Sequence, residues 1–268
     1  MKSSSAFKMR MQMDGMNRTR RDLSFGAGGA FFMMLGDLTL SLIPPCDTDE
    51  GLYLREAYMN GGYPGWKLTL LLLTGIVAIC GYYFGLRAMH DSLDDRYLKA
   101  KRWFRRCTLL FCFTGLAIHF SVGTGAYLTS YTAVHAGRDA AAAFIGDYTK
   151  AVEPGLILLY LPMGYVFLSH LVLLARGRTI YSRRMLLFHP LFWMALLAGI
   201  PDLRQMTGCH LVTLDYVMTQ CSGNFAPLVW FLACLLLPDR FKLPSEGDRR
   251  AFTLSYEKSE SRNKDAGR

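Results

Sequence analysis

Two ionisable residues with acid–base chemistry lie inside long apolar stretches of this sequence. Asp37 follows Gly36 in the first apolar stretch, and His119 lies in the third. A carboxylate beside an imidazole orients the ring and determines which ring nitrogen carries the proton. Such a pair can act as a general base, bind a cation, or form a hydrogen bond that holds two helices together. The sequence leaves these three interpretations open.

The two residues are predicted to share a depth and to face protein. At about 1.5 Å per helical residue, Asp37 lies about 20 Å and His119 about 18 Å from the inner ends of their stretches. Gly115, His119 and Gly123 recur every four residues and so lie on one helical face. Because small residues let helices approach closely, we expect this face to pack against a neighbouring helix.

Other polar residues fall in the same outer half of the apolar stretches. Together they predict a polar pocket that opens to the outer leaflet and binds a lipid headgroup, a small molecule or a cation; its candidate residues are Asp37, His119, Tyr160, Asp202 and Asn224. A metal site would need a further ligand beyond one His and two Asp, so no metal site is predicted and no cofactor is named.

The elements that must position these residues are membrane helices. The chain has 268 residues, of which 51% are hydrophobic and 19% charged. Apolar stretches of about 18 or more residues are typical of transmembrane helices. We therefore expect an all-α, polytopic bundle of six transmembrane helices, at about 24–43, 67–89, 107–130, 155–175, 185–200 and 219–238.

The distribution of Lys and Arg predicts the orientation. Four segments are basic: the N-terminal segment, 90–106, 176–184 and the C-terminal tail. The alternate connections, at 44–66, 131–154 and 201–218, have few basic residues. By the positive-inside rule, both termini lie in the cytoplasm (N-in/C-in) of a multi-pass cell-membrane protein. Residues 1–23 and 239–268 are expected to be disordered and to flank a transmembrane domain at 24–238.

Charge and cysteine content narrow the partners. The net charge of +9 is gathered beside the apolar stretches, which favours contact with anionic membrane lipids over nucleic acid. Among seven cysteines there is no Cys-x-x-Cys motif, but Cys209 and Cys221 are close enough in sequence to form a disulfide on the outer side. The source organism, the particular membrane and the oligomeric state do not follow from the sequence.

Three short motifs carry a resemblance to a family of six-helix membrane proteins known only as a domain of unknown function. They are Gly36-Asp37, the His119 helix with Gly123-Thr124-Gly125, and Gly199-Ile200-Pro201-Asp202. The resemblance spans about residues 24–238 and implies a topology but no activity.

Two alternatives concern activity. Ceramidase-like membrane hydrolases place Ser, Asp and several His around one zinc, whereas this chain offers Asp37, Ser121 and His119 in the outer layer and has no paired His in its last apolar stretch. A transporter would need a polar path from the pocket towards His170 and His189. No catalytic residue is assigned, and we expect a binding protein rather than an enzyme.

Overall fold

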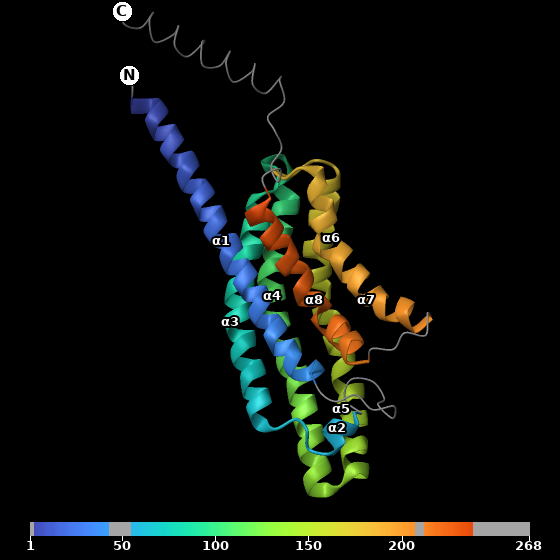
Figure 1. Cartoon of the computed structure of the whole chain (residues 1–268). Helices are drawn as coiled ribbons and strands as arrows, with labels where there is room; N and C mark the ends of the chain where they lie inside the picture. Colours follow the sequence, from blue (N-terminus) through green and yellow to red (C-terminus); the bar gives the residue numbers. More distant parts are fainter. Residues whose placement is uncertain (1–2, 43–54, 207–211, 238–268) are drawn as a thin grey trace, which may run out of the picture.

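Helix α1 (Ser3–Ser41) runs along the length of a helical bundle and packs against α3 (Gly65–Asp91) and α8 (Val212–Leu236) (Figure 1). The structure is a computed structural model that describes residues 3–42, 55–206 and 212–237. Within these ranges all regular structure is helical, in agreement with the all-α prediction.

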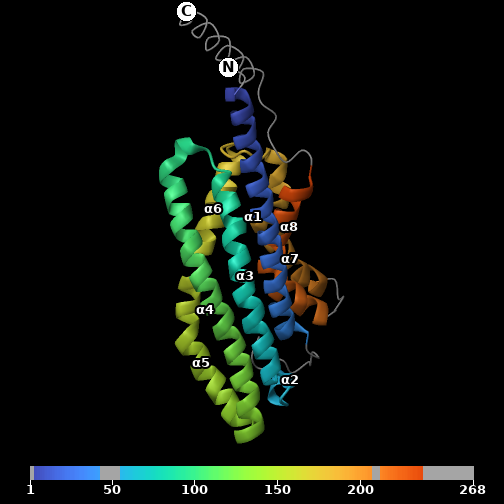
Figure 2. The same ribbon diagram turned by 90° about the vertical axis from the view of Figure 1, so that its left-hand side faces the viewer.

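A long helical hairpin completes the bundle. Helix α4 (Leu98–Ala136) packs against α3 on one side and against α5 (Arg138–Leu159) on another. The turn between α4 and α5 is Gly137, whose φ of +94° is a conformation that L side chains rarely adopt. Figure 2 shows the hairpin extending beyond the other helices at the end of the bundle opposite to the start of α1.

The remaining helices cover the other side of α4 and α8. Helix α6 (Leu161–Ala175) packs on α4, and α7 (Pro190–Met206) packs on α8. Short 3-10 helices at Asp95–Tyr97 and Arg183–Phe188 lie in the α3–α4 and α6–α7 connections, and α2 (Glu56–Met59) lies beside α4 at the opposite end of the bundle.

In the part of the chain that the structure describes, three helices are long and apolar enough to cross a membrane. They are Asn17–Ser41, Gly65–Asp91 and Asp95–Ala136, and they contain most or all of the first three predicted spans. Two shorter apolar helices are Leu161–Ala175 and Gln220–Leu236. The three candidate spans indicate a membrane location.

Exposed apolar side chains on the outside of the bundle agree with this location. Leu73, Phe113 and Leu161 are 59%, 77% and 64% exposed, and similar side chains surround each of them. A soluble monomer rarely exposes contiguous apolar surface of this kind. In a bilayer the same side chains face lipid, so their exposure does not oppose folding.

The predicted fourth span at 155–175 differs from the observed helices. Helix α5 begins at Arg138 and ends at Leu159, and α6 begins after Tyr160. Pro162 explains the interruption, because it has no N–H to donate to the carbonyl of Leu158 and its ring crowds the preceding turn. The alanine-rich segment Ala140–Ala143, which precedes the predicted span, is part of α5.

The N-terminus also differs from the predicted disorder of residues 1–23. Helix α1 begins at Ser3 and continues without a break into the apolar span. The segment contains no proline and is rich in Met, Lys, Arg and Gln, which favour helix, so the span extends towards the N-terminus at little cost. The tail 239–268 lies outside the described residues.

Glycines bring α1 and α3 into backbone contact. A Cβ atom on Gly29 would lie 2.6 Å from the carbonyl oxygen of Ala78 and 2.8 Å from the Cα of Gly81. A Cβ on Gly26 would lie 2.6 Å from the Cα of Gly85. No larger residue fits at these crossings, so they set the separation of α1, which carries Asp37, from α3.

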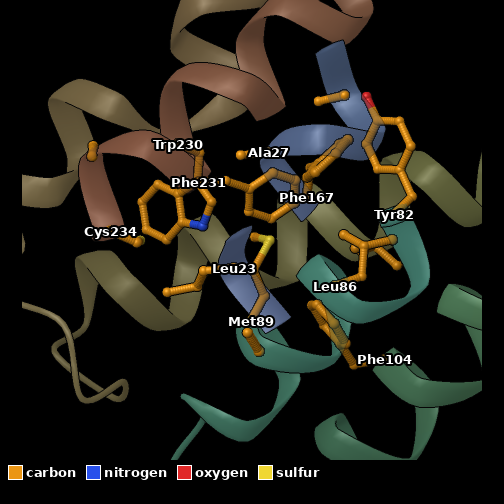
Figure 3. Close-up of a cluster of buried hydrophobic side chains, with 14 of the residues drawn as sticks. Leu23, Ala27, Tyr82, Leu86, Met89, Phe104, Phe167, Trp230, Phe231 and Cys234 are labelled. Carbon is orange, nitrogen blue, oxygen red and sulfur yellow. The ribbon is translucent and has the colours of Figure 1, made fainter. Parts of the chain in front are cut away.

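The half of the bundle around Leu23 of α1 and Met89 of α3 is filled by a packed apolar cluster. Aromatic and aliphatic side chains from α1, α3, α4, α6 and α8 meet there, among them Leu23, Tyr82, Phe104, Phe167, Trp230 and Phe231 (Figure 3). Tyr82 contacts Phe111 and Phe231 edge to face, at ring-centroid distances of 5.8 and 6.4 Å. The cluster fixes the mutual position of α1, α3, α4 and α8.

Polar contacts close the opposite end of α1. The Arg55 side chain is fully buried, and its Nη1 donates to the carbonyl oxygen of Leu40 at 2.8 Å. Tyr58 donates to the same oxygen at 3.2 Å. A cation and a hydroxyl there satisfy a carbonyl that the end of the helix leaves without an internal partner. They hold the last turn of α1, which begins at Asp37.

Candidate functional site

The His119 ring occupies a slot between two glycines. A Cβ atom on Gly36 of α1 would lie 2.7 Å from His119 Nε2, and a Cβ on Gly75 of α3 would lie 2.5 Å from its Cδ2. The imidazole of α4 therefore lies where two neighbouring helices have no side chain. Its Nε2 donates to the carbonyl oxygen of Leu71 in α3 at 3.0 Å.

Asp37 lies on the other side of this imidazole and belongs to a hydrogen-bonded chain across three helices. Asn224 Nδ2 of α8 donates to Asp37 Oδ2 at 2.5 Å. Tyr82 Oη of α3 donates to Asn224 Oδ1 at 2.7 Å. The chain fixes the orientation of the Asn224 amide, because its carbonyl must face the tyrosine and its amino group the carboxylate.

The second oxygen of Asp37 faces the imidazole. Oδ1 lies 3.8 Å from His119 Nδ1. Because Leu71 offers a carbonyl oxygen, Nε2 of His119 must carry a proton, and the Nδ1 of a neutral ring is then an acceptor. Two acceptors face each other across a gap too wide for a direct hydrogen bond. A water molecule or a cationic group that donates a hydrogen bond to each of the two atoms satisfies both.

The pair borders a cavity of about 320 Å³. Its polar wall comes from α1, α4, α8 and the α5–α6 junction, and its apolar wall from methionine, leucine, isoleucine, valine and phenylalanine side chains; the lining residues are Met33, Asp37, Leu40, Phe111, Gly115, Ile118, His119, Val122, Tyr160, Met163, Met194, Gln220, Ser222, Gly223 and Asn224. A few convergent polar groups in an apolar wall are typical of small-molecule pockets.

Asp37 has no lysine or arginine among the described residues to neutralise its charge. Its carboxylate belongs to a residue that is 8% exposed, and in the part of the chain that the structure describes no Lys or Arg lies within ion-pair distance of it. A charged carboxylate in this position is unfavourable without a counter-ion. The cavity therefore presents negative charge or a protonated acid to whatever enters it.

The structure brings four of the five predicted pocket residues to one cavity. Asp37, His119, Tyr160 and Asn224 all line it, and Tyr160 is 47% exposed at the break between α5 and α6. The fifth, Asp202, belongs to α7, but its side chain lies outside the described residues.

Several residues of the site were not predicted from the sequence. Tyr82 was not singled out, although it completes the hydrogen-bonded chain to Asn224. Gln220 and Ser222 line the cavity from α8. Gly75 of α3 gives the imidazole its space. Its depth in the second apolar stretch is close to that of His119, and this is the signal in the sequence that could have identified it.

The second histidine pair, His170 and His189, lies inside the bundle and away from the Asp37 cavity. His170 and His189 are both fully buried, with rings stacked 5.5 Å apart and Trp230 edge-on to each of them. Neither histidine lines the cavity beside Asp37. The two polar layers of the bundle are therefore distinct sites.

The predicted disulfide stays a prediction. Cys221 is 5% exposed and hydrogen-bonds to Ser41 at the end of α1. Its predicted partner Cys209 lies outside the described residues.

Comparison with known proteins places the chain in a family without assigning an activity. No curated protein and no solved structure matches it significantly. One family model does match, over residues 1–238, which include every helix described above. The chain belongs to this family, described as a family of unknown function (DUF6796).

Proposed function

We propose that the protein is a six-span, N-in/C-in protein of the cell membrane whose outer pocket binds a small ligand through a protonated amine or another compact cationic group. The observation that carries the proposal is the buried Asp37 carboxylate, which faces the acceptor nitrogen of His119 and has no lysine or arginine partner among the described residues. A cation that donates hydrogen bonds satisfies both groups at once.

The rest of the wall supports an amphiphilic ligand. Met33, Met163 and Met194 line the cavity, and methionine side chains adapt to apolar groups of varied shape. The ring of Tyr160 offers a face to a cation at the mouth. A volume of about 320 Å³ accommodates a compact amine or the headgroup of an amine-bearing lipid, but not a whole phospholipid.

The hydrolase alternative receives less support from this geometry. A general base needs one imidazole nitrogen oriented by the protein and the other free to take a proton from the substrate. Here Nε2 is occupied by the Leu71 carbonyl, and Nδ1 faces Asp37, which would normally be the orienting group. Although Nδ1 has no direct hydrogen bond, it faces an acid rather than a nucleophile, and among the described residues no hydroxyl or thiol is hydrogen-bonded to it.

The transporter alternative needs a path between the two polar layers. The cavity ends before the inner histidines, because neither His170 nor His189 is among its lining residues. The packed cluster around Phe111, Phe167 and Trp230 lies in the inner half of the bundle. A static pocket fits this arrangement better than a conduit.

Binding of a matched pair of probes tests the proposal. Benzylammonium and benzyl alcohol have nearly the same shape, but only the first carries a charge. Titrated into the full-length protein in lipid nanodiscs, benzylammonium is expected to bind saturably and the alcohol at least about tenfold more weakly, since the charge-assisted contact with Asp37 is lost. Equal affinities for both probes would remove the basis of the proposal.

The topology is tested separately. Reporter fusions after residues 95, 180 and 245 are expected to report the cytoplasm, and fusions after 55 and 140 the external side. An external C-terminus would contradict six spans, because it requires an odd number.

A further inference from the structure

We propose that the inner end of α4 binds the headgroup of an anionic phospholipid. The binding surface is the basic stripe, defined as Lys99, Arg102, Trp103 and Arg106. Their spacing of three, four and seven residues places them on one face of the helix. All four side chains are exposed and together border a hollow of about 210 Å³. Figure 2 shows this half of α4 at the edge of the bundle.

The charge of the stripe is uncompensated, unlike that of its neighbours. Arg96 is paired with Asp94, where the arginine lowers the pKa of the aspartate to about 2, and Lys101 is paired with Asp95. In the described parts of the chain, no carboxylate lies within ion-pair distance of Lys99, Arg102 or Arg106. Three cations without an acid among them form a site for a phosphate group.

The aromatic member of the stripe orders one of these cations. The guanidinium of Arg106 lies over the ring of Trp103, 5.3 Å from its centroid. Such a contact holds an arginine in place, while the N–H groups of its guanidinium stay available to donate hydrogen bonds to a phosphate. Tryptophan is also the side chain most at home at the level of lipid headgroups.

The hollow continues towards α6. A second space of about 620 Å³ shares Lys99, Arg102 and Trp103 and reaches Tyr165 of α6. The stripe is therefore one side of a groove between two helices, and a hydroxyl from the second helix lines it. This provides room for a headgroup larger than a bare phosphate.

The same helical face becomes apolar one turn further along α4. Leu110 and Phe113, which follow Arg106 by four and seven residues, are 52% and 77% exposed, and Phe120 after them is 51% exposed. A ligand that places phosphate on the stripe can therefore lay an acyl chain along the continuing face. This continuity favours a phospholipid over a soluble phosphate compound.

The inference requires that α4 crosses the membrane, as its length and composition indicate, but it does not depend on ligand binding beside Asp37. The stripe and the outer pocket have different ligands and different readouts. Failure of one therefore leaves the other intact.

Lipid retention tests the site. The full-length protein, purified from mixed micelles of phosphatidylglycerol and phosphatidylcholine, is examined by native mass spectrometry for bound lipid. The triple variant Lys99→Gln/Arg102→Gln/Arg106→Gln is expected to retain about tenfold less phosphatidylglycerol, with phosphatidylcholine unchanged. The matched control Arg20→Gln/Arg176→Gln/Arg183→Gln removes three exposed charges from the same side of the bundle and is expected to behave as the wild type.

A second measurement locates the lipid without altering charge. Phosphatidylglycerol brominated along its acyl chains is expected to quench tryptophan fluorescence, and Trp103→Phe is expected to remove most of the saturable part of this quenching. Equal loss of phosphatidylglycerol from both triple variants would show a general charge effect and overturn the site. Unchanged retention in the stripe variant, or unchanged quenching in Trp103→Phe, would overturn it as well.

Discussion

Replacing Asp37 by Asn is expected to weaken benzylammonium binding by at least about tenfold while leaving the protein folded. Asparagine keeps the size of the side chain, and its carbonyl can still accept the hydrogen bond that Asn224 now donates to Asp37. What is lost is the negative charge opposite His119. A charge-assisted hydrogen bond contributes about 1.5–3 kcal/mol, so the dissociation constant should rise by about 10- to 100-fold. Titration in nanodiscs measures the change, with the thermal midpoint as the control for folding.

Asp37→Leu separates the binding role from the structural one. Leucine removes both the charge and the acceptor, which leaves Asn224 Nδ2 without its hydrogen-bond partner in a buried region. Each unsatisfied group costs about 1–3 kcal/mol, so this variant should also lose thermal stability. If Asn and Leu lower stability equally and neither changes probe affinity, Asp37 only holds helices together.

Replacing Gly75 by Ala is expected to destabilise the bundle and to weaken probe binding together. The added Cβ would lie 2.5 Å from His119 Cδ2, and the imidazole cannot retreat because Gly36 of α1 lies against its other side. The ring must move, which breaks the hydrogen bond from Nε2 to Leu71. Overpacking of this kind costs about 1–3 kcal/mol, enough to lower the thermal midpoint by several degrees.

Gly28→Ala is the matched control for this prediction. Gly28 lies in α1, two turns before Gly36, and a Cβ there meets nothing within 4 Å. Alanine favours helix over glycine by up to about 1 kcal/mol, so this variant should be neutral or slightly more stable. The two substitutions therefore carry opposite expected signs. A Gly75→Ala protein as stable as Gly28→Ala would mean that His119 does not occupy the slot between the glycines.

The sequence was informative about the site where periodicity and depth sufficed. Asp37 and His119 were expected at one depth on small-residue faces, and they line one cavity 3.8 Å apart. The reason is simple geometry, since two helices that run in the same direction carry residues of equal count to equal height. The faces followed from the Gly115 and Gly123 stripe.

The remaining features depended on packing that spacing alone does not encode. The partner of His119 Nε2 is a backbone carbonyl, that of Leu71, which no residue type reveals. Tyr82 reaches Asn224 because α1 and α3 touch at their glycines, a separation that only the three-dimensional crossing shows. The break at Tyr160 is different, because Pro162 is visible in the sequence and indicates a helix boundary there. The continuous apolar stretch across this position led instead to the prediction of one uninterrupted span.

The most direct test of the account is the ¹⁵N spectrum of the His119 side chain. In protein labelled with ¹⁵N-histidine and placed in nanodiscs, the His119 resonances are assigned by their absence in His119→Gln. If Asp37 and His119 form a cation-binding pocket, Nε2 is protonated and bound to the Leu71 carbonyl. The Nδ1 resonance is then expected to shift saturably with benzylammonium but not with benzyl alcohol. The same titration of Asp37→Asn should leave Nδ1 unchanged. An Nδ1 resonance that ignores benzylammonium in the wild-type protein would contradict the proposal that Asp37 and His119 form a cation-binding pocket.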